Sequence, residues 1–270
     1  MHAKLAHLKS IISRYPSALI AFSGGVDSTF LAHVTAEVLN KKVLLITASS
    51  STYPISEQEE AMKLAQRMGI PHRVIVSEET EIKGFADNTP HRCYYCKQEL
   101  FSKLTTLAMQ EGFAVVFDGS NADDLDDYRP GRKAVCELGV VSPLCEAGLS
   151  KAEVRELSRE RGLSTADKPS YACLASRFPY GEKITREKLE RVGRAEEELK
   201  RLGFRQFRVR SHLDLARIEV TPAEIEKAWQ MRAAIGDACK KAGFTFVAID
   251  LQGYRTGAMN EVLNRGASIL

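Results

Sequence analysis

SALIAFSGGVDSTFLAHVTAEVL, residues 17–39, is the stretch that determines how this chain folds. Its apolar beginning, 17–22, predicts a buried strand, and the periodic apolar residues of 28–39 predict a helix. Glycines between the two let a backbone approach an anion closely, and a helix start offers free N–H groups and the positive end of its dipole. The stretch therefore predicts a phosphate-binding loop at the carboxyl end of a strand.

The predicted loop consists of Ser23, Gly24, Gly25, Val26, Asp27 and Ser28. Its serines add hydroxyl donors, and the Asp27 carboxylate suits a magnesium ion that bridges to phosphates. The loop lacks the ending of a Walker loop, and its glycine spacing does not fit a dinucleotide fingerprint. A plain Gly-Gly turn is the alternative, which the position of the loop after the first strand disfavours.

Strands and helices alternate along the first part of the chain. Further strands are predicted at 42–48, 72–76 and 113–119, and helices at 56–69, 96–112, 131–138 and 150–162, the last capped by Ser150. This alternation predicts an α/β fold with a doubly wound parallel sheet. Such sheets bind ligands beyond the carboxyl ends of their strands.

The pattern changes after residue 165, which predicts two domains, 1–165 and 166–270. A connecting segment at 164–185 is followed by a predicted helix (185–202), hairpin (204–220), helix (221–241) and strand (244–250), the pattern of a smaller α+β domain. The first domain carries 19 basic and 21 acidic side chains, and the second carries 19 and 14. An anionic ligand therefore suits the second domain.

The composition is that of an ordinary globular protein. The 270 residues are 44% hydrophobic and 27% charged, with a net charge of +3. A chain of this length buries a large core without disulfides, and its apolar runs are shorter than the ~20 residues of a membrane helix. We expect a cytoplasmic protein that forms a homo-oligomer and binds neither membranes nor nucleic acid.

Two further segments follow predicted strands on the ligand-binding side of the sheet. Ala48 and Ser49 end the second strand, and a polar segment after the fourth strand contains Gly119, Ser120, Asn121 and Asp124. Gly119 allows a close approach of the backbone, and its neighbours offer polar contacts. A polar turn rich in Asx residues is an equally good interpretation of the second segment.

Three of the six cysteines stand in segments that suggest chemistry. Cys93 and Cys96 form a C-x-x-C pair, which lets two thiolates bind one metal or cluster. Cys173 precedes Arg177, whose positive charge favours a thiolate. A closed zinc site needs four ligands, and no fourth ligand has convincing spacing. Cys239 lies on an apolar helical pattern and is predicted to be a buried, inert thiol.

The predicted hairpin of the second domain gathers charged residues on one face. Alternate residues of a strand share a face, so Arg208 and Arg210 lie together, and the hairpin register places Arg217 and Glu219 beside them. Guanidinium groups bind phosphate through paired hydrogen bonds, which predicts a phosphate site. Glu219 is a possible metal ligand there. The alternative is a solvated face with cross-strand ion pairs.

The hexapeptide 23–28 resembles the loop of enzymes that split ATP into AMP and pyrophosphate. Members of that superfamily adenylate a substrate before a nucleophile displaces AMP. The wider pattern is similar to the LarE family, the sulfur transferases that help to build the nickel-pincer nucleotide cofactor. The matching segments are HRCYYCK (91–97), DGSNADD (118–124), residues 128–144, CLASRFPYGEKIT (173–185), RVR (208–210), ARIEV (216–220) and residues 250–260.

The resemblance implies ATP, Mg²⁺ and a pyridinium mononucleotide whose carboxylates are adenylated and then converted to thiocarboxylates. ATP would bind to the loop and to Ala48, Ser49, Gly119, Ser120, Asn121 and Asp124. The substrate phosphate would bind to Arg208, Arg210 and Arg217.

The family implies two sources of sulfur. In one, Cys173 gives up its own sulfur and becomes dehydroalanine. In the other, Cys93, Cys96 and Cys173 hold a 4Fe-4S cluster that carries an exchangeable sulfide from an outside donor. The C-x-x-C pair favours the cluster, because sacrifice requires Cys173 alone.

Three other functions also fit parts of this sequence. An amidating synthetase of the NAD or GMP synthetase kind shares the loop. Such an enzyme needs a source of ammonia, and it does not need the cysteines. A transfer-RNA thiolation enzyme shares the loop and the cysteines, but such an enzyme needs a broad basic surface that binds RNA. A non-catalytic nucleotide-binding module has no use for the cysteine-bearing segment 164–185.

Overall fold

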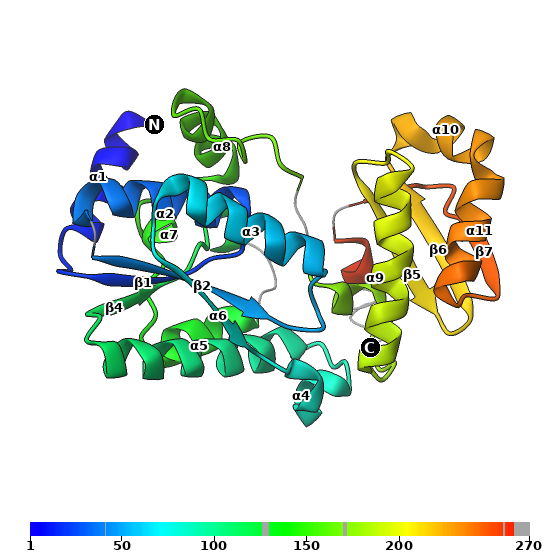
Figure 1. The fold of residues 1–270 in the computed structure, drawn as a ribbon, viewed down its shortest axis with the longest axis horizontal. Helices are drawn as coiled ribbons and strands as arrows, with labels where there is room; N and C mark the ends of the chain where they lie inside the picture. The colour runs from blue at the N-terminus through cyan, green and yellow to red at the C-terminus, as the bar shows by residue number, and fades with distance from the viewer. Residues whose placement is uncertain (41, 126–129, 170–171, 256, 262–270) are drawn as a thin grey trace, which may run out of the picture. The chain divides into compact units, whose positions relative to one another are not determined.

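The computed structural model describes residues 1–40, 42–125, 130–169, 172–255 and 257–261. The chain forms two units (Figure 1): unit 1 is Met1–Phe85 with Pro90–Tyr171, and unit 2 is Ala86–Thr89 with Ala172–Leu270. Residues 128, 129 and 256 of the motifs quoted above lie outside the described residues. The predicted boundary between domains at residue 165 stays a prediction.

Unit 1 is built on a parallel sheet of four strands. They are β1 (Ala18–Ala21), β2 (Val43–Ser49), β3 (His72–Val76) and β4 (Val115–Phe117), in the order β3-β2-β1-β4. Ile20 of β1 lies opposite both Leu45 of β2 and Phe117 of β4. All three pairings are parallel, which confirms the predicted α/β fold.

Helices cover both faces of this sheet (Figure 1). One face packs on α1 (His2–Ile12), α2 (Val26–Leu39), α3 (Ile55–Met68), α7 (Pro143–Glu146) and α8 (Lys151–Glu160); the other packs on α5 (Arg92–Glu111) and α6 (Gly131–Glu137). Successive strand residues serve opposite faces: Ile20 joins the first core and Leu19 the second. Burial on both sides explains why these strands are continuous apolar runs.

The helix starts differ in how well the sequence signals them. Ser150 caps α8 as predicted: its side chain accepts from the Glu153 N–H, and the Glu153 carboxylate accepts from the Ser150 N–H at 2.9 Å. The predicted start of α5 at Cys96 was wrong, because the helix begins at Arg92 without a capping side chain. Gly131 of α6 packs closely against this start, where a Cβ on Gly131 would lie 3.0 Å from the Cys93 carbonyl oxygen.

Shorter helical turns complete unit 1: η1 (Glu79–Glu81), α4 (Lys83–Ala86), whose last residue belongs to unit 2, and η2 (Ala122–Leu125). Within the described ranges, no helix combines the length and apolar character needed to cross a bilayer.

Unit 2 contains a three-stranded sheet in the order β5-β6-β7. The predicted hairpin is confirmed as β5 (Phe207–His212) and β6 (Leu215–Val220), and β7 (Phe246–Ile249) pairs in parallel with β6. The other elements are η3 (Leu174–Arg177), α9 (Arg186–Arg201), η4 (Pro222–Glu224), α10 (Ile225–Gln230), α11 (Arg232–Ala242) and η5 (Ala258–Asn260). The long helix predicted at 221–241 is thus divided near Met231. Cys239 is buried, and burial raises the pKa of its thiol to about 11.

Candidate active site

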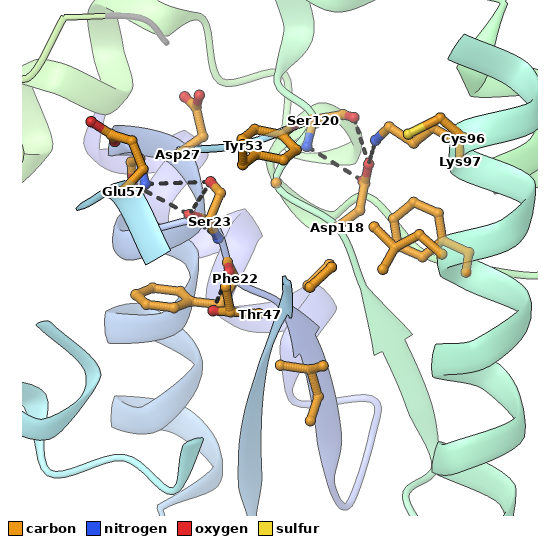
Figure 2. A pocket seen from close by; sticks show the side chains of 18 of the residues that line it. Phe22, Ser23, Asp27, Thr47, Tyr53, Glu57, Cys96, Lys97, Asp118 and Ser120 are labelled. Carbon is orange, nitrogen blue, oxygen red and sulfur yellow. Dashed lines mark hydrogen bonds and ion pairs between the residues drawn. The ribbon is translucent and has the colours of Figure 1, made fainter. Parts of the chain in front are cut away.

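A cavity of about 320 Å³ opens in unit 1 where β1, β2 and β4 end (Figure 2). Its polar wall is formed by loop and strand-end residues, and Phe22, Ile46, Leu100 and Phe101 line it with apolar groups. Carboxyl ends of parallel strands meet at one edge of a sheet, which is where such folds bind ligands. The cavity therefore lies where the sequence predicts a ligand site.

The 23–28 loop is held by its own hydrogen bonds. The hydroxyls of Ser23 and Ser28 lie 3.1 Å apart, the Ser23 N–H donates to Ser28 Oγ at 3.3 Å, and the Gly25 N–H donates to Ser23 Oγ at 3.3 Å. Helix α2 starts at Val26, so the second half of the loop is already the first turn of the helix. Hydroxyls and the first N–H groups of a helix are thus concentrated at one end of the cavity, which is an arrangement suited to phosphate.

Two glycines allow the backbone to pack around this loop. Gly24 has a φ of +66°, and a Cβ there would lie 3.0 Å from the Ala61 backbone of α3. A Cβ on Gly119 would lie 3.2 Å from the Ser28 nitrogen. Gly119 therefore allows the end of β4 to approach the start of α2 closely.

Asp27 lines the cavity and is held from two sides. Its Oδ1 accepts from the Asn121 amide at 3.3 Å, and its Oδ2 forms a close ion pair with the Lys151 ammonium. The carboxylate is partly exposed, so an incoming cation can reach it. An oxygen donor next to a phosphate loop fits the Mg²⁺ that the sequence predicts.

Asp118 is a second buried carboxylate at the cavity. It accepts from the hydroxyls of Ser120 at 2.7 Å and Ser142, and the Lys97 ammonium lies 3.2 Å away. Burial alone would raise the pKa of Asp118, but the Lys97 charge and the two hydroxyls hold it below its ordinary value. Figure 2 shows Lys97 and Cys96 reaching the same end of the cavity from α5.

Cys96 also lines the cavity, beside the buried Glu79. Its Sγ lies 3.8 Å from Glu79 Oε1, and the Ser50 hydroxyl donates to the other oxygen of that carboxylate. Cys93 is exposed, three residues earlier on the first turn of α5. The i, i+3 spacing puts both thiols on one helix face, at the N-terminal end of α5. This pair therefore fits two ligand positions of a cluster.

Cys173 belongs to unit 2, at the start of η3. Among the residues that the structure describes, neither unit by itself gathers three metal-binding side chains. The predicted convergence of Cys93, Cys96 and Cys173 therefore stays a prediction.

Arg177 holds the Cys173 segment through its backbone. The fully buried guanidinium donates to the carbonyls of Ala172 at 3.0 Å and Cys173 at 3.3 Å, and it pairs with Glu196 of α9 at 2.7 Å. Burial alone would raise the pKa of Glu196, but the Arg177 charge outweighs it and lowers that pKa. Glu196 Oε1 also accepts from the Val209 N–H at 3.0 Å, which ties α9, β5 and the Cys173 segment together.

The charged face of the hairpin has the predicted register: Arg208 lies opposite Glu219, and Arg210 opposite Arg217. Arg210 Nη2 lies 2.9 Å from Glu219 Oε2, Arg217 Nη2 lies 3.0 Å from Glu219 Oε1, and Arg210 Nη1 donates to the Ser176 carbonyl at 2.7 Å. Arg208 and Arg210 are buried, and burial together with the nearby Arg177 charge lowers the pKa of Arg208. Arginines on both carboxylate oxygens disfavour Glu219 as a metal ligand.

The predicted ATP-binding residues divide into two groups. Ser23, Gly25, Asp27, Ser28, Ala48, Gly119, Ser120 and Asp124 line the cavity. The others support it: Gly24 and Val26 are buried in the loop, Asn121 binds Asp27, and the Ser49 carbonyl accepts from Ser77.

Sequence reasoning missed the lysines around the loop. Lys97 borders the cavity, Lys151 pairs with Asp27, and Lys168 lies 3.0 Å from Glu57 and 3.4 Å from the Gly24 carbonyl oxygen. Lys97 follows Cys96 directly, so it could have been proposed. The other two are more than 100 residues from their loop partners, and nothing local marks them.

Comparison with known proteins agrees with this geometry. Residues 17–211 match the asparagine synthase family. The tRNA-specific 2-thiouridylase MnmA of Renibacterium salmoninarum is 30% identical, over 56% of this chain and 50% of that protein. The fold and the loop thus place unit 1 in the class of asparagine synthase-like phosphate-loop domains.

Two relatives cover almost the whole chain. The uncharacterized protein slr1717 of Synechocystis is 46% identical over 98% of this chain and all of its own length. Pyridinium-3,5-bisthiocarboxylic acid mononucleotide synthase of Lactiplantibacillus plantarum is 36% identical over 97% of this chain and 95% of its own length. The chain belongs to the LarE family, as its motifs predict.

Proposed function

We propose that this protein is an ATP-dependent sulfur transferase. It converts carboxylates of a pyridinium mononucleotide to thiocarboxylates for a nickel-pincer nucleotide cofactor. The observation that carries the proposal is the cavity of unit 1, whose wall holds both the 23–28 loop and Cys96. A phosphate loop next to a thiol suits activation by ATP followed by sulfur transfer. Similarity to the Lactiplantibacillus synthase over nearly the full length supports this substrate class.

The first step adenylates the substrate. A carboxylate oxygen attacks the α-phosphorus of ATP, the bond from that phosphorus to the bridging oxygen breaks, and pyrophosphate leaves. The loop and the α2 N-terminus bind the phosphates, and Asp27 would hold Mg²⁺, which would neutralise phosphate charge. Lys97 offers a cation to the incoming carboxylate. Ala48, Ser49, Gly119, Ser120, Asn121 and Asp124 surround the rest of the nucleotide.

The second step replaces AMP by sulfur. A sulfur nucleophile attacks the carbonyl carbon of the acyl adenylate, and AMP leaves with the electron pair of the broken C–O bond. In the cluster route, Cys93, Cys96 and Cys173 would hold a 4Fe-4S cluster, which would supply exchangeable sulfide. In the sacrificial route, the Cys173 thiolate forms a thioester; loss of its Cα proton then breaks the Cβ–Sγ bond and leaves dehydroalanine.

The chain connectivity supports a shared role for the two cysteine segments. Asn88 belongs to unit 2, where its amide donates to the carbonyls of Phe178 at 3.3 Å and Pro179 at 2.6 Å. Asn88 is five residues before Cys93, and Phe178 is five residues after Cys173. The segments that carry Cys93 and Cys173 therefore both lead away from a hydrogen-bonded point of unit 2.

The substrate phosphate is the proposed ligand of Arg208, Arg210 and Arg217. Arg217 is the most accessible of the three, with 37% of its side chain exposed, so it offers the first contact. Arg177 is a positioning residue, because it fixes the Cys173 backbone. We further propose a homo-oligomeric, cytoplasmic enzyme.

Product analysis tests the function. The protein is reconstituted with iron and sulfide without oxygen, then supplied with ATP, Mg²⁺, sulfide and the dicarboxylated pyridinium mononucleotide. AMP, pyrophosphate and a sulfur-containing nucleotide are expected, whereas an amidated product would show an amidating synthetase. Intact-mass measurement separates the routes: many turnovers at unchanged mass support the cluster, and one turnover with dehydroalanine at position 173 supports sacrifice.

A further inference from the structure

The ion pair between Lys151 and Asp27 has a geometry that bears on the order of ligand binding. Lys151 is the first residue of α8, and its backbone is fixed: its N–H donates to Asp123 Oδ2 at 2.9 Å, and the preceding Ser150 is held by the capping box. Its side chain, 29% exposed, reaches from there to the Asp27 carboxylate. A fixed backbone with a long, flexible side chain allows the ammonium to change partners without moving the helix.

The surroundings of Asp27 are arranged around this contact. Asn121 donates its amide to Asp27 Oδ1 at 3.3 Å and accepts the Asp123 N–H at 3.0 Å, while Asp123 accepts the Lys151 N–H. These contacts close a ring through Asp27, Asn121, Asp123 and Lys151. Asp27 Oδ1 thus accepts the Asn121 amide, and Asp27 Oδ2 is bound by the Lys151 ammonium.

That second oxygen is the one a metal ion would take. An ammonium and a divalent cation on the same carboxylate repel each other, unless further negative charge enters the site. ATP brings that charge, and its phosphates also give the displaced ammonium new oxygen partners. Lys151 therefore has a favourable second position only when nucleotide is bound.

We propose that Lys151 occupies the magnesium position on Asp27 in the free protein and moves to the phosphates when ATP enters. Mg²⁺ then binds together with the nucleotide rather than before it. The inference rests on the proposed function, since it takes the 23–28 loop as the phosphate site. It assigns Lys151 as a positioning residue that makes metal binding depend on nucleotide.

Manganese binding measured by electron paramagnetic resonance tests this without turnover. The titrations use Mn²⁺ alone and Mn²⁺ with α,β-methylene-ATP, which cannot be cleaved at the reacting bond. The variants are Lys151→Met, Asp27→Asn and the double variant. Lys9→Met is the matched control, because Lys9 pairs with Glu37 at 2.8 Å, near the end of α2 that lies opposite to Asp27.

Lys151→Met is expected to bind Mn²⁺ alone about tenfold more tightly than the wild type, and the Mn²⁺–nucleotide complex about tenfold more weakly. Asp27→Asn should remove both kinds of binding, and Lys9→Met should change neither. The inference is overturned if Lys151→Met binds Mn²⁺ alone as the wild type does, while Asp27→Asn loses the complex. If Asp27→Asn keeps wild-type affinity for the complex, the proposed ATP site itself is wrong.

Discussion

The two units hold their buried carboxylates in different ways. In unit 1, Asp118 at the cavity pairs with Lys97, whose side chain is 38% exposed, and shares its oxygens with the hydroxyls of Ser120 and Ser142. In unit 2, Glu196 pairs through both oxygens with Arg177, which is completely buried. The cation of the first pair is open to an incoming ligand, and that of the second is closed to it.

This difference separates groups that can change partners from groups that hold the fold. A ligand phosphate or carboxylate can attract Lys97 or Lys151 at modest cost, because water already reaches both ammonium groups. Separating Arg177 from Glu196 would break an ion pair in the interior, which costs far more than breaking an exposed one. The cavity of unit 1 is therefore the chemically adjustable region, and the arginine network of unit 2 is a rigid support for the Cys173 segment.

The largest effect is expected from breaking the rigid pair. Glu196→Ala leaves the Arg177 charge buried without its carboxylate, which should lower the free energy of unfolding by about 3–5 kcal/mol. Asp118→Asn keeps the contacts with Ser120 and Ser142 and leaves Lys97 solvated. It should therefore lower the free energy of unfolding by only about 1–3 kcal/mol. Urea unfolding of both variants measures the difference. Equal losses would show that the buried pair and the partly exposed pair contribute alike to stability.

The pH dependence gives an independent measure of the same pair. The pKa of Glu196 lies below its ordinary value of 4.5 in the folded protein, so the unfolded chain takes up this proton first. The stability contributed by the ionised carboxylate is present above that value and is lost as the pH falls below it. Glu196→Gln should therefore unfold with a weaker pH dependence than the wild type between about pH 5 and 3. A parallel pH dependence would exclude Glu196 as a source of acid sensitivity.

The adjustable region is tested by the loop. Ser28→Ala removes a hydroxyl that closes the loop, and Asp27→Asn removes the carboxylate proposed for Mg²⁺. Each should lower the formation of AMP and pyrophosphate by about 100- to 1,000-fold, because each removes stabilisation of developing phosphate charge. Circular dichroism should remain that of the wild type. Normal turnover by Asp27→Asn would show that Asp27 has no role in catalysis.

A third test asks whether the rigid region also binds substrate. Arg208→Ala and Arg210→Ala each remove a charged hydrogen bond of ~1.5–3 kcal/mol, so binding of the pyridinium nucleotide should weaken by roughly 10- to 150-fold. ATP binding should change little, because the ATP cavity belongs to unit 1. Arg232 is an exposed arginine beside Trp229, so Arg232→Ala controls for the loss of a positive charge alone. Equal losses for both ligands would limit these arginines to a role in stability.

Local patterns in the sequence predicted the parallel sheet and the position of the loop well. Ser23–Ser28 follow a buried strand directly, so the ligand-binding end of that strand could be located without a structure. The start of α5 and the ion pair of Asp27 were not predictable in this way. Both depend on residues distant in sequence: Gly131 packs against Cys93, and Lys151 lies 124 positions after Asp27. The burial of Arg210 was missed for the same reason, since Ser176 of η3, 34 positions earlier, supplies a partner.

The smallest effect concerns how closely the helices pack in each unit. An alanine at Gly131 would bring a Cβ within 2.9 Å of Lys97 Cγ and 3.0 Å of the Cys93 carbonyl oxygen. Lys97 can move, but the backbone of α5 cannot, so Gly131→Ala should destabilise by about 1 kcal/mol after the entropic gain of alanine. Gly236 of α11 is the matched control in unit 2, because no atom outside its own helix lies within 4 Å of an added Cβ. Gly236→Ala should stabilise by about 0.5–1 kcal/mol.

Thiol labelling extends this test to the site. The close contact at Gly131 fixes the first turn of α5, which carries both Cys93 and Cys96. Displacing that turn should change the rate at which a water-soluble thiol reagent modifies Cys93, which is exposed in the wild type. Gly236→Ala should leave the rate unchanged. If Gly131→Ala keeps wild-type stability and an unchanged labelling rate, α6 does not position the start of α5. That segment would then be adjustable, like the Lys97 and Lys151 side chains, and not rigid.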